Sequence, residues 1–134
     1  MYLNELNPEQ SAMFLELAKH VMELDGKLQA EEAGVFSGFC SECALPDYQL
    51  KHQGDIGNVI QFFTNTELRI KRVVMVELFG VALADGDACE QELSFLAKLG
   101  EQFTISSHEQ KRLQRWVEAM NDLVAEGYGL VLKD

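Results

Sequence analysis

One short pattern, which occurs twice at a distance of sixty residues, constrains the fold of this chain most. Residues 24–32 read Leu-Asp-Gly-Lys-Leu-Gln-Ala-Glu-Glu, and residues 84–92 read Ala-Asp-Gly-Asp-Ala-Cys-Glu-Gln-Glu. Both copies consist of an Asp-Gly pair, five further residues and a glutamate, and both lie between stretches of helical apolar spacing. The chain is therefore expected to contain two helical hairpins with equivalent corners.

Helical signals run along most of the sequence, whereas the sustained alternation that is typical of strands does not occur. Asn7 is a suitable N-cap for a helix that has Pro8 at its first position, and Gly26 marks the end of that helix. A second helix is expected to end before Pro46. The pattern predicts an all-α fold.

The second half of the chain predicts a central helix and a long last helix. Residues 68–83 are apolar on nearly every side, so this helix should be surrounded by others, with Thr66 as its cap. Ser106 and Glu109 form a capping box that opens the last helix. That helix is expected to end at the glycines at 127 and 129 and to bury Leu113, Trp116, Val117, Met120, Leu123 and Val124.

The repeat also fixes the expected domain organisation. Residues 14–56 align with residues 74–116 without a gap, so that apolar positions meet apolar positions. Together with the length of 134 residues, this predicts a single domain, 1–134, with internal repeat units at roughly 8–56 and 68–125. Two helical hairpin units, related by a pseudo-twofold axis and packed as one bundle, are the simplest architecture.

Composition narrows the function classes. The net charge of −11 argues against nucleic acid, because a binding face would need a basic surplus. No apolar run approaches the roughly 20 residues that span a bilayer, and no signal peptide is recognisable, so we expect a soluble cytoplasmic protein without direct membrane insertion. Basic residues gather only loosely, in two groups far apart in the sequence: Arg69, Lys71 and Arg72, and Lys111, Arg112 and Arg115.

Three cysteines do not suggest a disulfide framework. Cys40 and Cys43 form a C-x-x-C on a helix face that is otherwise apolar, so two buried thiols are the preferred interpretation. Redox or zinc use is the alternative, although a zinc site would need two further ligands.

The Asp-Gly corners allow three interpretations, and the first is structural. Glu32 and Glu92 would occupy the third position of their helices and accept hydrogen bonds from the backbone at the helix start. Gln29 and Cys89 occupy the expected cap positions, and neither is a strong cap. The corners would then need no ligand.

The second interpretation is calcium binding, and the third is a recruited site. The calcium-loop consensus ends in the same Asp-Gly-x5-Glu, but its first ligand position holds Val21 in one copy and Val81 in the other. The chain is therefore not an EF-hand, and a cation would be bound weakly or with waters completing its shell. In the third interpretation both corners meet a protein partner or a shared metal, and the second corner is the more acidic, with Asp85, Asp87, Glu90 and Glu92.

On these residues the chain resembles the TerB-like family of bacterial tellurite-resistance and stress-response proteins, a module also found at the N-terminus of membrane-tethered DnaJ-type co-chaperones. The resemblance rests on residues 24–26 and 84–86, each with its Glu seven positions after the Asp, and on the helical repeat; it covers roughly residues 8–125. Gln29 and Cys89 depart from the Ser or Thr that family members usually carry there.

The resemblance implies an all-helical bundle of about seven helices that has no catalytic activity and joins metal-sensing or membrane-associated stress complexes. No cofactor is required, and calcium or magnesium are the expected cations. The implied metal contacts are Asp25, Glu32, Asp85 and Glu92, to which the local charge adds Asp87 and Glu31.

Two function hypotheses follow. The first is a cytoplasmic helical module for metal or tellurite stress complexes, which binds protein partners and divalent cations through its acidic corners. The alternative is a purely structural or scaffolding interaction domain without metal binding. An enzyme ranks third, because the chain has no P-loop, dinucleotide, zinc-protease or nucleophile-elbow motif. The sequence leaves the oligomeric state and the partners open.

Overall fold

The computed structural model describes residues 1–24, 30–84 and 88–132, apart from the side chains of residues 30–32. Over these residues the chain forms six α-helices and one 3-10 turn and contains no strand, which confirms the predicted all-α class. The elements are η1 (Leu3–Glu5), α1 (Pro8–Glu23), α2 (Ala30–Glu42), α3 (Ile56–Thr64), α4 (Leu68–Ala82), α5 (Glu90–Gln102) and α6 (Ser107–Val131).

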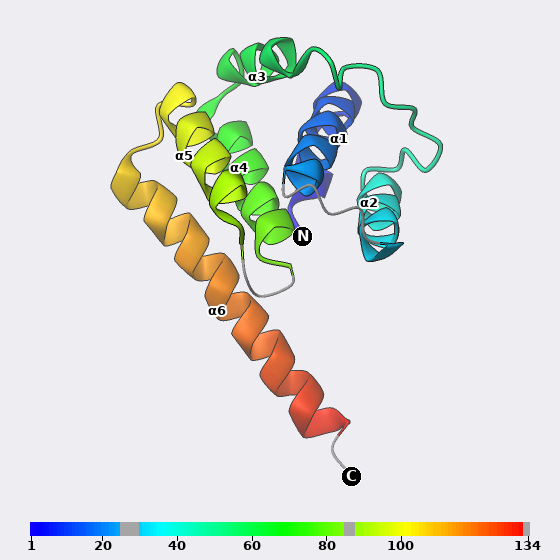
Figure 1. Ribbon diagram of the computed structural model, residues 1–134, viewed down its shortest axis with the longest axis vertical. Helices are drawn as coiled ribbons and strands as arrows, with labels where there is room; N and C mark the ends of the chain where they lie inside the picture. The colour runs from blue at the N-terminus through cyan, green and yellow to red at the C-terminus, as the bar shows by residue number, and fades with distance from the viewer. Residues whose placement is uncertain (25–29, 85–87, 133–134) are drawn as a thin grey trace.

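Helix α4 forms the centre of the bundle. It packs against α1, α5, α6 and η1, while α1 in turn contacts α2 and α3 (Figure 1). Every residue from Val73 to Phe79, almost two full turns of α4, is buried, so all sides of the helix are covered there. The prediction of a surrounded helix is therefore confirmed, and each of these apolar side chains contributes about 1.5–3 kcal/mol through burial.

The sixty-residue repeat recurs in the backbone. The bounds of α4 and α5 follow those of α1 and α2 at this spacing to within one residue. Both hairpins end in the same turn, in which Ala44 and Thr104 each have a φ of 59°. The next amide, of Leu45 or Ile105, donates to the carbonyl five residues earlier, at 2.8 and 3.0 Å respectively. Both turns are therefore Schellman motifs that close their helices in the same way.

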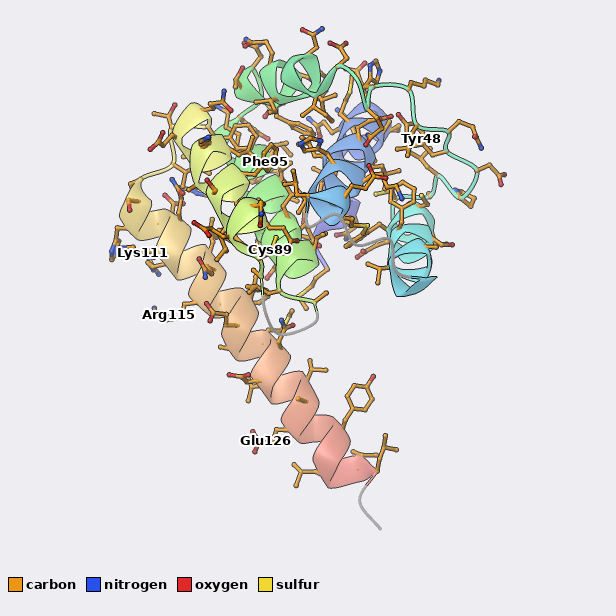
Figure 2. All side chains as sticks on the ribbon, in the orientation of Figure 1. Tyr48, Cys89, Phe95, Lys111, Arg115 and Glu126 are labelled. Atoms are coloured by element: carbon orange, nitrogen blue, oxygen red, sulfur yellow. The ribbon has the colours of Figure 1, made fainter. Side chains whose placement is uncertain are left out.

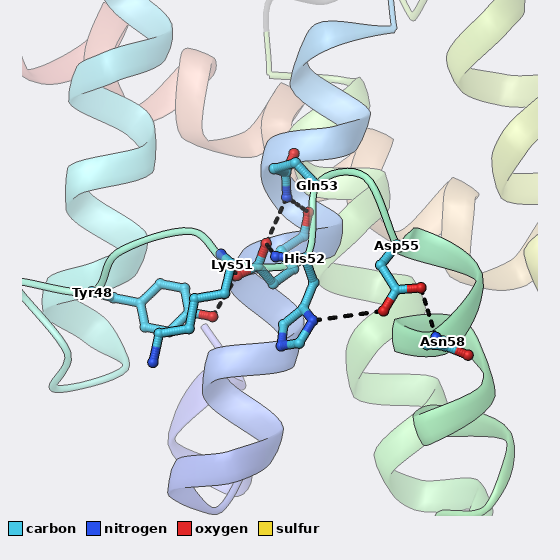
Figure 3. Close-up of polar contacts among 7 residues, drawn as sticks. Tyr48, Lys51, His52, Gln53, Asp55 and Asn58 are labelled. Atoms are coloured by element: carbon cyan, nitrogen blue, oxygen red, sulfur yellow. Dashed lines mark hydrogen bonds and ion pairs between the residues drawn. The ribbon is translucent and has the colours of Figure 1, made fainter.

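The two halves differ after this turn: α6 begins directly after it at Ser107, whereas in the first half the next helix, α3, begins only at Ile56. In the first half residues 46–55 are irregular, and the fully buried carboxylate of Glu16 holds them (Figure 3). One oxygen accepts from the Lys51 amide at 2.8 Å and from the Tyr48 hydroxyl. The other accepts from the His52 amide at 3.1 Å and from the Gln53 side chain at 2.8 Å. A buried anion thus replaces helical hydrogen bonds in ordering this segment.

These hydrogen bonds keep Glu16 ionised. Burial by itself would raise the pKa of Glu16, but the donors from Tyr48, Lys51, Gln53 and His52 outweigh it and lower the pKa below the usual 4.5. Burial and the contact with the carboxylate raise the pKa of the Tyr48 hydroxyl. Tyr48 therefore remains a donor at neutral pH.

The helix caps follow the sequence only in part: the capping box predicted for Ser106 and Glu109 is half formed, because the Glu109 side chain pairs with Arg72 instead of the backbone. Asn7 caps α1 in a capping box, and the Ser106 hydroxyl accepts from the Glu109 amide at 3.1 Å at the start of α6. The prediction for Thr66 is wrong: Glu67 is the N-cap of α4, and the Thr66 hydroxyl donates to the Phe63 carbonyl at 2.7 Å. Thr66 therefore closes the end of α3 instead of opening α4.

The predicted end of the last helix is also wrong. Helix α6 continues through Gly127 and Gly129 to Val131. Glycine permits a helix to end but does not require it, because its cost is only about 1 kcal/mol relative to alanine. None of the described helices combines the length and the apolar content that crossing a bilayer requires.

The burial expected along α6 is found only in part. Val117 is buried, but Trp116, Val124 and Leu123 are 41, 51 and 67% exposed. Figure 1 shows why: the second half of α6 projects beyond the other helices. Apolar periodicity predicts that a helix has an apolar face, but it does not say whether another element covers that face.

Candidate functional site

The second acidic corner contains a helix cap. Cys89 is the N-cap of α5: its sulfur accepts from the Glu92 amide at 3.4 Å, and Glu92 Oε1 accepts from the Cys89 amide at 3.2 Å. Only 7% of Glu92 is exposed. The reciprocal hydrogen bonds of a capping box are thus present, with sulfur in the place of the usual hydroxyl oxygen.

The other predicted ligands cannot be placed. Asp25, Asp85 and Asp87 lie outside the described residues, as do the side chains of Glu31 and Glu32. Within the part of the chain that the structure describes, no group of three or more His, Cys, Asp or Glu side chains could hold a metal ion. Cation binding at the corners therefore stays a prediction.

Changing the cap atom tests the structural role of this corner. Replacement of Cys89 by serine should stabilise the protein by about 0.5–1 kcal/mol, because a hydroxyl oxygen accepts an amide hydrogen bond better than a thiol does. Replacement by alanine should lower the stability by a similar amount. Urea denaturation measures both variants, and equal midpoints for the two would show that position 89 does not cap the helix.

The C-x-x-C pair spans the end of α2, so only Cys40 lies in the predicted helix face. Cys40 of α2 is buried, Cys43 follows the helix end and is half-buried, and both are free. Burial raises the pKa of both thiols, so they are protonated at neutral pH. Because the thiolate is the reactive and metal-binding form, this environment favours structural thiols, although only Cys40 is as buried as predicted.

A second surface brings together all four arginines of the chain. Arg69 and Arg72 come from α4, Arg112 and Arg115 come from α6, and Trp116, the only tryptophan, adjoins both pairs. Two hollows meet at Trp116: one of about 320 Å³ lined by the α4 arginines, and one of about 500 Å³ lined by the α6 arginines. We call the surface formed by these five residues the arginine groove.

The arginines of α4 are already paired. Arg69 forms ion pairs with Glu5 and Glu67, each at 3.0 Å, and all three side chains are largely exposed. Arg72 pairs with Glu109 and so links α4 to the first turn of α6. These exposed pairs contribute little to stability, but they hold the guanidinium groups at one edge of the groove.

The arginines of α6 are available for a ligand. Among the described side chains, neither Arg112 nor Arg115 has a carboxylate within ion-pair distance, and both are exposed. Between the two arginine pairs lies the Trp116 ring, whose centroid is 5.9 Å from that of Tyr2. The remaining lining of the hollow at α4 is apolar: Val73, Val76 and Leu113. The groove therefore offers guanidinium forks beside an apolar, aromatic floor, which suits a ligand with both carboxylates and apolar groups.

Sequence inspection found the two basic groups but not their proximity. Forty residues separate Arg72 from Arg112, and nothing local indicates that α4 and α6 pack together there. One signal was available: within each helix the two arginines are three positions apart and so share a face.

Comparisons with known proteins do not add to this picture. No family model matches the chain, and neither a curated protein nor a solved structure shows significant similarity to it. The resemblance to the TerB-like family therefore stays a prediction, and the side chains of the arginine groove are the structural feature that points to a function.

Proposed function

We propose that this protein is a helical interaction module whose arginine groove binds an acidic, partly apolar segment of a protein. The observation that carries the proposal is the gathering of every arginine around the single tryptophan, in a chain with a net charge of −11. A basic patch on an acidic protein selects for a ligand that is locally negative. Tryptophan and arginine are also the residues most enriched at the energetic centres of protein interfaces.

Other ligand classes fit the groove less well. A long nucleic acid would extend past the groove over a protein whose acidic residues outnumber its basic ones twofold in total. A small anion could pair with the arginines but would leave the apolar lining of Val73, Val76 and Leu113 uncovered. An amphipathic acidic helix supplies carboxylates and apolar side chains along one face.

The family resemblance adds a cellular context to the proposal. We propose that the partner belongs to a cytoplasmic stress complex of the metal or tellurite type, as the TerB-like family implies. Divalent cation binding at the acidic corners is a separate proposal, which calcium or magnesium titration tests through the amide signals of residues 25–32 and 85–92. Unchanged amide signals at millimolar calcium or magnesium would rule out cation binding and favour the alternative, a scaffolding domain that binds no metal.

Charge reversal in the groove tests the proposed function. A fluorescently labelled amphipathic helix with Glu and Leu on one face should bind the wild-type protein, as measured by fluorescence anisotropy. The double variant Arg112→Glu with Arg115→Glu should weaken binding on the order of 100-fold, because two guanidinium partners become repulsive carboxylates.

The matched control places the same change of net charge elsewhere. Lys98→Glu with Lys111→Glu removes two exposed lysines that do not line either hollow. This variant should bind the peptide within a few-fold of the wild type. Equal losses in the two variants would mean that only the overall charge matters, and the arginine groove would then not be the site.

A further inference from the structure

The second half of α6 is a free apolar helix. Among the described residues, the polar contact of α6 with the bundle nearest to its C-terminal end is the Asn121 side-chain amide, which donates to the carbonyl of Leu83, the residue after α4, at 3.2 Å. Beyond it, Leu123, Tyr128 and Leu130 are 67, 64 and 73% exposed, and Figure 1 shows this part projecting away from the bundle. A short helix without tertiary packing is marginal in water, so a covering partner would stabilise it considerably.

The uncovered face of α6 has the spacing of a coiled-coil seam. Its members alternate between steps of four and three residues along the whole helix, which is the heptad period. Apolar residues occupy one set of seam positions, and a basic, a small and an acidic residue occupy the other. The seam is Arg112, Trp116, Ala119, Leu123, Glu126 and Leu130.

Charge changes sign along α6. Its first half is net basic, because Lys111, Arg112 and Arg115 outnumber the two glutamates at 109 and 118, and its free half carries only Asp122 and Glu126. Figure 2 shows Arg115 on the part beside the bundle and Glu126 on the projecting part. An antiparallel partner with the same sequence would therefore place acidic residues against arginines at both ends, whereas a parallel one would place like charges together.

We infer that the segment bound in the arginine groove is the free half of α6 from a second copy of this chain. This inference rests on the proposed function, since it names the partner of the same groove. Two copies pair antiparallel with their α6 helices crossing near Ala119, whose small side chain permits close approach. Arg112 and Arg115 of one copy meet Asp122 and Glu126 of the other, and the symmetry repeats these contacts.

The oligomeric state of charge-reversed variants tests the inference. In sedimentation equilibrium the wild-type protein should form a dimer as its concentration rises from low micromolar to near millimolar. Arg112→Glu with Arg115→Glu, and separately Asp122→Arg with Glu126→Arg, should each raise the dimer dissociation constant on the order of 100-fold. Combining all four substitutions reverses the charge of both halves of α6 and keeps the net charge of the wild type. This variant should therefore form the dimer again.

The outcomes separate this inference from the proposed function. A wild-type protein that stays monomeric throughout, or a fourfold variant no better than either double variant, overturns pairing with a second copy. If the monomer still binds the labelled acidic helix through Arg112 and Arg115, the groove takes a different protein and the proposed function stands. If the wild-type protein binds neither a second copy nor the labelled acidic helix, both proposals are wrong.

Discussion

Replacement of Glu16 by alanine is expected to destabilise the protein by about 3–4 kcal/mol, a large share of the total stability of a small domain. The substitution leaves the amides of Lys51 and His52 and the Tyr48 hydroxyl without the acceptor that they share. Urea denaturation measures the loss. Hydrogen exchange at Lys51 and His52 should accelerate more than exchange in α4, because residues 46–55 lose the group that orders them.

Two further variants keep this prediction testable if the alanine variant does not fold. Tyr48→Phe removes a single donor and should cost about 1–2 kcal/mol. Glu16→Gln keeps the volume of the side chain but turns an NH2 group toward the donors of residues 48–53. Its loss of stability should therefore lie between those of Tyr48→Phe and Glu16→Ala. An unchanged urea midpoint for Glu16→Gln, with Lys51 still protected, would show that the buried carboxylate does not order this segment.

The same carboxylate makes the stability depend on pH. Because the pKa of Glu16 is lower in the folded protein than its usual 4.5, the contribution is complete above that value and is lost as the pH falls through the folded pKa. The stability difference between the wild type and Glu16→Gln should therefore be constant near neutral pH and shrink in acid.

Replacement of Phe103 by alanine is expected to cost about 3–5 kcal/mol, because it opens a cavity in the core between the end of α5 and α3. Phe103 follows α5, is fully buried and contacts the ring of Phe63 of α3 edge-on, with centroids 6.5 Å apart. Phe95→Ala, within α5 and only half-buried, is the matched control and should cost clearly less. Equal losses from thermal denaturation would mean that Phe103 is not a central packing residue.

Local signals in the sequence predicted the helices and most of their caps. The repeat of Asp-Gly-x5-Glu placed the corners, and the uniformly apolar α4 identified the central helix. Asn7 and Ser106 cap their helices because the side-chain oxygen and the amide that it accepts from are only three residues apart. Such features depend on neighbours along the chain, which a sequence displays directly.

Features that depend on distant residues were missed. Glu16 lies in a helix between apolar neighbours, yet its donors are more than thirty residues away. The arginine groove requires the α4 and α6 faces to meet, and the exposure of Leu123 depends on where the bundle ends. None of these follows from periodicity, because periodicity specifies a helix face and not its surroundings.

The fluorescence of Trp116 reports binding at the arginine groove, because this is the only tryptophan of the chain and it lines the groove. Addition of the unlabelled acidic helix to the wild-type protein should shift the emission to shorter wavelength as the exposed indole becomes covered. The Arg112→Glu, Arg115→Glu variant should show no shift at the same peptide concentration. If the peptide leaves the emission spectrum of the wild-type protein unchanged, the acidic helix does not bind at the arginine groove.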